Sequence, residues 1–160
     1  SRKWPVESYI ALCQKIGQEL GWIGVIVGGP AEAAIADRMV KECSAPLLDW
    51  TARCKVPELW KLFQFSQFTL CNESGLAHVA SLCGSFVQII CGAADPRRTR
   101  PLGPGRVQVA VHPVECWPCE RNHCEQPLGM KLRCLAGITT PIVFEEIQRG
   151  LKLDGREGAV

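Results

Sequence analysis

Five short apolar segments alternate with helical patterns along this chain, and the alternation constrains the fold more than any other feature. The segments are residues 23–27, 46–49, 68–71, 86–91 and 107–111. Between them, apolar side chains recur at helical spacing, as in residues 6–20. Parallel strands need a crossover connection, which is usually a helix. We therefore predict an α/β protein of the Rossmann-like kind: an open, mainly parallel sheet with helices on both faces.

Composition agrees with this fold and excludes several classes of protein. The chain has 160 residues, of which 47% are apolar, enough to bury a core. Charged residues make up 21% and the net charge is only +2, which argues against a disordered chain and gives no sign of nucleic-acid binding. No apolar run approaches the ~20 residues that span a bilayer. We expect one domain over residues 1–153 and a frayed tail over 154–160, excised from a longer protein.

Ligands of open α/β sheets bind beyond the carboxyl ends of the strands, so the loops there are the first candidates for a site. Residues 72–78, with the sequence Asn-Glu-Ser-Gly-Leu-Ala-His, form such a strand-to-helix junction. Its free N–H groups would face an anion, and Gly75 lets a ligand approach the backbone. His78 lies one helical turn after Ser74. The alternative interpretation is an ordinary helix cap followed by a core histidine.

Two further strand-end loops carry charge. Glu32 lies near the third position of a helix, where a carboxylate either caps the helix or grips two ribose hydroxyls. Residues 95–104 hold three arginines, whose forks match phosphate oxygens, although surface loops are often this basic. The sequence has no Walker loop and no G-x-G-x-x-G motif, which argues against P-loop chemistry and a standard dinucleotide site.

Cysteine is the unusual residue, with ten in the chain. Six are scattered, mostly within apolar runs, where a free cysteine behaves as a small apolar side chain. The other four have the spacing Cys116-x2-Cys119-x4-Cys124-x9-Cys134. Such a quartet makes a tetrahedral zinc site, a set of reduced surface thiols or an opportunistic disulfide. Because the sequence shows no signal segment, we expect a reducing, cytoplasmic location.

Taken together, these motifs resemble glycosyltransferase family nine, the ADP-heptose:lipopolysaccharide heptosyltransferases. The similar stretches are residues 2–7 (Arg-Lys-Trp-Pro-Val-Glu), 28–30 (Gly-Gly-Pro), 72–78, 92–99 (Gly-Ala-Ala-Asp-Pro-Arg-Arg-Thr) and Cys116-x-x-Cys119. The resemblance runs from about residue 2 to residue 148. It implies the C-terminal, donor-binding half of an enzyme with the GT-B fold, which is built from two Rossmann-like halves.

The resemblance also implies a set of residues that contact a nucleotide-sugar donor: Arg2, Glu32, Cys54, Glu73, Ser74, Gly75 and His78. Residues 73–78 would lie at the diphosphate and sugar, with Arg2, or Lys3 in its place, near the phosphates. Glu32 would grip the ribose and Cys54 would lie against the adenine. Glu73 stands where the family more often has Asp. Residues 51–55 lack the family's Gly-Lys-Thr/Ser character, which leaves the identity of the base open.

The implied activity is transfer of heptose from ADP-heptose to the core of lipopolysaccharide. The catalytic base and the site for the lipid-linked acceptor would belong to an N-terminal half outside this sequence. This half would then contribute no catalytic residue, metal or cofactor beyond the donor substrate, and alone it would be inactive. The resemblance places the full-length protein at the inner face of the inner membrane, as a peripheral protein with no transmembrane segment and no nucleic-acid partner.

Two other classes of function fit the same residues. One is a non-catalytic nucleotide-binding module, and the other is a metal-stabilised interaction domain built around the cysteine loop, residues 116–134. Some family members lack these cysteines, which favours free thiols and rules against a catalytic role. Because the cysteine loop follows the last predicted strand, beyond the strand-end loops, we expect a structural appendage that is not part of the donor site.

Overall fold

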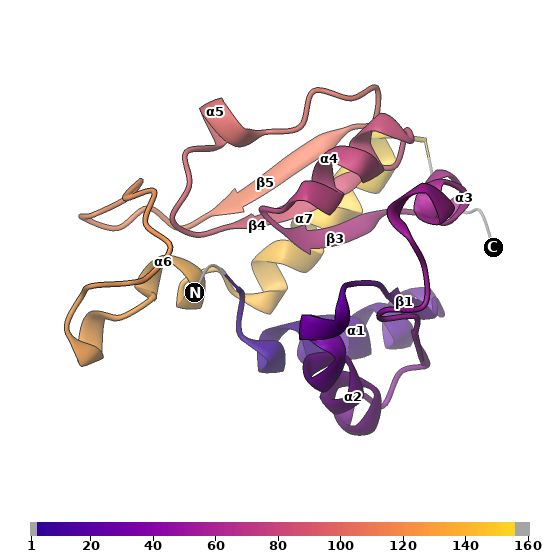
Figure 1. The fold of residues 1–160 in the computed structure, drawn as a ribbon, viewed down its shortest axis with the longest axis horizontal. Helices are drawn as coiled ribbons and strands as arrows, with labels where there is room; N and C mark the ends of the chain where they lie inside the picture. Colours follow the sequence, from indigo (N-terminus) through magenta and orange to yellow (C-terminus); the bar gives the residue numbers. More distant parts are fainter. Residues whose placement is uncertain (1–2, 156–160) are drawn as a thin grey trace. The chain divides into compact units, whose positions relative to one another are not determined.

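A computed structural model describes residues 3–155 of the chain (Figure 1). Arg2 and residues 156–160, most of the predicted tail, lie outside this range. The described chain falls into two compact units, one of residues 5–59 and one of residues 60–155 with residues 3–4. Each unit is described by itself, and the domain boundaries stay a prediction. No helix among the described residues is long and apolar enough to cross a membrane.

The smaller unit combines two helices with a two-stranded parallel sheet. Its elements are α1 (Val6–Leu20), β1 (Gly24–Ile26), η1 (Pro30–Glu32), α2 (Ala33–Glu42), β2 (Leu47–Asp49) and η2 (Val56–Glu58). α1 ends at Gly21, whose φ of 69° is left-handed backbone that glycine adopts without strain. β1 pairs with β2 in parallel, and η1 and α2 form the crossover between them.

The larger unit is built on a three-stranded parallel sheet of order β3-β4-β5. Its elements are α3 (Leu59–Phe65), β3 (Thr69–Asn72), α4 (Gly75–Leu82), β4 (Val87–Cys91), α5 (Pro96–Thr99), β5 (Val107–Val111), η3 (Leu128–Met130), α6 (Arg133–Ala136) and α7 (Thr140–Leu153). β4 is central and every one of its residues is buried, as an apolar parallel strand should be. Figure 1 shows α4 and α7 on opposite faces of this sheet.

The core of the larger unit lies between β4 and α7. Gln88 of β4 is fully buried, and its amide donates a hydrogen bond to Glu146 of α7 at 2.8 Å. α7 approaches the sheet closely at Gly150, where a Cβ would lie 2.2 Å from the Phe86 ring. Burial raises the pKa of the Glu146 carboxyl above its ordinary value, although its bond with Gln88 acts in the opposite direction.

The α/β class and the parallel strands are confirmed, and all five predicted strands are present. The strands form two separate sheets, however, and not one. The sequence could not predict this, because apolar periodicity locates strands without saying which of them pair. α7 begins directly after Thr139. Thr139 is the N-cap, with extended backbone, and Thr140 is already helical. The short helices α5 and α6 were not predicted.

Candidate functional site

The strand-to-helix junction, residues 72–78, lies at the carboxyl end of β3. Ser74 is the N-cap of α4, with extended backbone (φ −157°, ψ 166°), and its side chain makes no capping hydrogen bond. The first N–H groups of a helix have no partner within the helix. A Cβ placed on Gly75 would find no heavy atom within 4 Å, so the space beside the first residue of the helix is open. This is a geometry that an anion can approach.

His78 is exposed, and so are Ser74 and Gly75 at the start of the same helix. The alternative interpretation of His78 as a core histidine is therefore wrong. The backbone N–H of Glu73 donates to the carbonyl of Ile90 at 3.3 Å, which ties the junction to the end of β4. The junction thus presents an exposed imidazole and an open helix start on a rigid sheet edge.

Asn72, which the sequence analysis did not single out, fastens the N-terminal segment to this junction. Its Oδ1 accepts a hydrogen bond from the backbone N–H of Trp4 at 2.8 Å. Trp4 is only 3% exposed, and its indole N–H donates to the carbonyl of Ile138 at 2.9 Å. Lys3 consequently lies next in the chain to a residue held at the carboxyl end of β3. The only available signal for Asn72 was its position, as a polar residue at the end of a strand.

Glu32 and Cys54 lie in the smaller unit. The Glu32 carboxylate accepts a hydrogen bond from the backbone N–H of Gly29 at 3.1 Å, which is the capping arrangement. The backbone N–H of Ala52 donates to the carbonyl of Gly28 at 2.9 Å. The loop that carries Glu32 and the loop that leads to Cys54 are therefore neighbours beyond the strands of that unit, as a shared nucleoside site would require.

The arginines of residues 95–104 already have partners within the chain. The Arg97 guanidinium lies 2.7 Å from the Asp95 carboxylate and holds the pKa of that carboxyl below its usual range. Arg98 pairs with Glu120 at 2.8 Å. Arg100 donates to a carbonyl of β5 at 3.0 Å. These partners favour the surface-loop interpretation over a dedicated anion site.

The family model of glycosyltransferase family 9 (heptosyltransferase) matches residues 1–128. This chain belongs to glycosyltransferase family 9. No curated protein sequence matches it. The family model ends before Cys134, so the last member of the cysteine quartet lies outside the matched region.

Solved structures with the same fold carry related names. The chain is similar to E. coli ADP-heptose LPS heptosyltransferase II (TM-score 0.78, 19% identity), covering 96% of this chain and 43% of that one. A family 9 glycosyl transferase from Veillonella parvula gives a TM-score of 0.75 at 19% identity, covering 95% and 42%. E. coli heptosyltransferase WaaC with ADP gives 0.67 at 18% identity, covering 93% and 40%. The chain thus spans about two fifths of these proteins.

In this family 9 chain the cysteine loop lies against the end of β4. The backbone N–H of Glu120 donates to the carbonyl of Ala93 at 2.8 Å. Leu135 packs against Gly92, where a Cβ would lie 2.7 Å from the leucine Cγ. The premise that this loop lies beyond the strand-end loops is therefore wrong, whereas the expectation that it is no part of the donor site stays a prediction. The loop follows β5 in the sequence, but it returns to the neighbouring strand, which spacing alone could not reveal.

Proposed function

We propose that this chain is the donor-binding half of a glycosyltransferase that moves heptose from ADP-heptose to the core of lipopolysaccharide. The observation that carries the proposal is the open start of α4 at Gly75, one helical turn from exposed His78. Membership of family 9 supports the reaction class. The names of the similar structures support an ADP-linked donor, since one is an ADP-heptose enzyme and another contains ADP.

The residues of the junction would act on the leaving group. As the bond to the sugar breaks, the departing diphosphate gains negative charge, and the N–H groups and dipole at the start of α4 favour that charge. The imidazole of His78 would donate a hydrogen bond to the diphosphate or the sugar. Lys3, held beside the junction through Trp4, would supply a cation near the phosphates. Arg2 would have the same role.

Glu32 and Cys54, both in the smaller unit, would contact the nucleoside of the donor. Glu32 would accept hydrogen bonds from the ribose hydroxyls, and Cys54 would lie against the base. The base that deprotonates the acceptor hydroxyl would come from the other half of the enzyme. That half would also bind the lipid-linked core oligosaccharide at the inner face of the membrane. The donor substrate is the only small molecule that this proposal needs.

Titration calorimetry with ADP on the wild-type chain and on His78→Ala tests the proposal. We expect weak binding by the wild type, because half of the cleft belongs to the rest of the enzyme. The variant should bind about tenfold more weakly, since a hydrogen bond to a charged group contributes ~1.5–3 kcal/mol and 1.4 kcal/mol is a factor of ten. His123→Ala, which removes another exposed histidine, is the matched control. Equal affinities in all three proteins, with melting lowered in His78→Ala, would return His78 to a structural role.

A further inference from the structure

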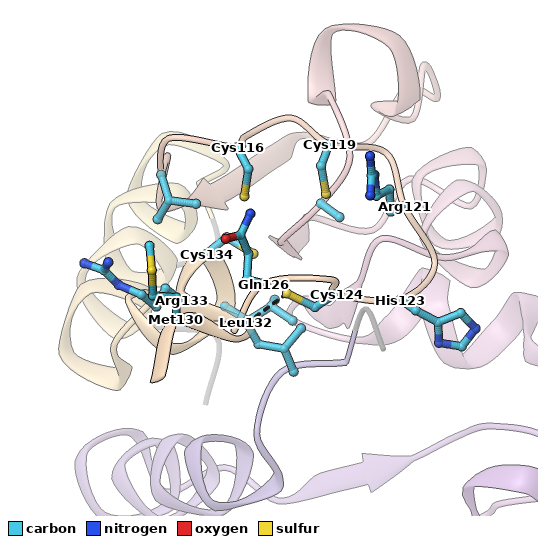
Figure 2. Close-up of a pocket in the computed structure, with 13 residues that line it drawn as sticks. Cys116, Cys119, Arg121, His123, Cys124, Gln126, Met130, Leu132, Arg133 and Cys134 are labelled. Atoms are coloured by element: carbon cyan, nitrogen blue, oxygen red, sulfur yellow. Dashed lines mark hydrogen bonds between the residues drawn. The ribbon is translucent and has the colours of Figure 1, made fainter. Parts of the chain in front are cut away.

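We propose that Cys116, Cys119, Cys124 and Cys134 together bind one Zn²⁺ ion, which holds the cysteine loop in place. The proposal does not depend on the donor site. The four residues line one pocket, to which Ala93 at the end of β4 also contributes. Figure 2 shows the four side chains around this pocket, with Cys116 and Cys119 pointing into it from one stretch of the loop.

The pocket has room for a metal ion. Its volume is about 30 Å³, and one water needs ~10–15 Å³ measured this way. A wider hollow of about 440 Å³ is lined by Cys116, Cys119 and Cys124. An ion could enter through this hollow.

The chemistry of the thiols is suited to zinc. Cys124 Sγ accepts a hydrogen bond from the backbone N–H of Leu132 at 3.4 Å. Hydrogen bonds of this kind orient metal ligands. Four soft thiolates select Zn²⁺ over the oxygen-preferring Mg²⁺ and Ca²⁺.

The backbone of the loop needs such a fastening. Residues 112–139 contain only the short helices η3 and α6, and Leu128 is 94% exposed. Glu120 and Leu132 are two of the three non-glycine residues with left-handed φ in residues 3–155, at 54° and 57°. Each such residue costs of order 1–3 kcal/mol and persists only where its surroundings hold it. A metal that ties the turns after Cys119 and before Cys134 would hold both of them.

The thiols are not yet arranged as a finished metal site. Among residues 3–155, no three His, Cys, Asp or Glu side chains have that arrangement. Binding must therefore draw the sulfurs inwards, to Zn–S distances of ~2.3 Å. The Cys116-x2-Cys119 and Cys119-x4-Cys124 spacings are both within the range that zinc knuckles use. The resulting site would be closed and structural.

The test is metal analysis of the chain purified under reducing conditions without added metal. We expect close to one zinc per chain, and Co²⁺ in its place should give the charge-transfer absorption of thiolate ligands. Cys124→Ser and Cys134→Ser should each lose the zinc. The affinity for zinc should fall by more than the ~10–100-fold that is lost when a residue hydrogen-bonded to a metal ligand is replaced. The matched control is Cys43→Ser, which removes a thiol from the smaller unit.

A measurement on the unaltered chain covers the case in which a serine variant fails to fold. Stripping the metal with a chelator should lower the melting temperature, and returning Zn²⁺ should restore it. A zinc-free chain whose Co²⁺ spectrum lacks thiolate bands would overturn the proposal. So would a disulfide within the loop of the reduced preparation, or zinc retained by both serine variants, since the ion would then lie elsewhere.

Discussion

The junction and the cysteine loop lie at the same edge of the larger unit's sheet, yet they are built in different ways. The junction joins two regular elements, β3 and α4, and leaves open space in front of Gly75. The cysteine loop has little regular structure and surrounds a pocket with four thiols. The comparison teaches that the helix start is positioned by the two regular elements it joins, whereas few regular elements position the thiols of the loop.

Trp4 ties the junction to the segment that precedes α7, and its removal should have the largest effect. Its backbone bonds Asn72 at the junction, and its indole bonds Ile138, just before α7. Because it is 3% exposed, Trp4→Ala should lower the free energy of unfolding by ~3–5 kcal/mol. Denaturant unfolding checks this. The control is Trp60→Ala, since Trp60 is 53% exposed and should change stability by less than ~0.5 kcal/mol. Equal losses in the two variants would mean that the burial and hydrogen bonds of Trp4 do not stabilise the fold.

A smaller loss of stability is expected at Asn72. Asn72→Ala leaves the N–H of buried Trp4 unpaired, which should cost ~1–3 kcal/mol. Asn72→Asp keeps an acceptor oxygen and should recover most of the loss. Thermal melts of both variants measure this, with ADP titration as a second readout for the position of Lys3. Identical melting of the alanine and aspartate variants would contradict the role of the Trp4 hydrogen bond.

Two glycine substitutions test which of the two regions, the junction or the cysteine loop, binds ADP. A Cβ at Gly75 or at Gly129 meets no heavy atom within 4 Å, so a side chain can start at either place without a clash at its Cβ. Gly75→Val should fill the space in front of α4 and weaken ADP binding about tenfold, which corresponds to 1.4 kcal/mol. Gly129→Val, in the cysteine loop, should leave ADP binding unchanged. Calorimetry on folded variants decides, and the reverse pattern would move the nucleotide to the loop.

The smallest effect is a difference in thiol reactivity within the metal-free chain. The pKa of Cys124 is lowered, so its thiolate fraction at pH 8 exceeds that of an ordinary cysteine, and the pKa of Cys134 is raised, which has the opposite effect. Iodoacetamide should therefore label Cys124 faster than Cys134, by a few-fold. Mass spectrometry of quenched samples reads the two rates. Faster labelling of Cys134 would show that the hydrogen bonds to Cys124 do not control reactivity.

Much of the fold could be predicted because apolar periodicity is local. The fifth strand, Val107–Val111, has the bounds that the sequence predicted, and the exposed His78 follows Ser74 by one turn as expected. Pairing between strands, the role of Asn72 and the return of the cysteine loop to Ala93 all depend on contacts distant in sequence. The spacing of residues along the sequence does not predict such contacts. The donor roles of Glu32 and Cys54 stay predictions.

The most direct test of the central claim is to titrate the ¹⁵N-labelled chain with ADP and follow the backbone amides. We predict that the amides of Gly75 and Leu76 shift most, because a bound diphosphate accepts hydrogen bonds at the start of α4. A free sugar at the same concentration should shift them far less. Shifts confined to the cysteine loop, or no shifts at millimolar ADP on folded protein, would contradict the claim that this junction binds the donor.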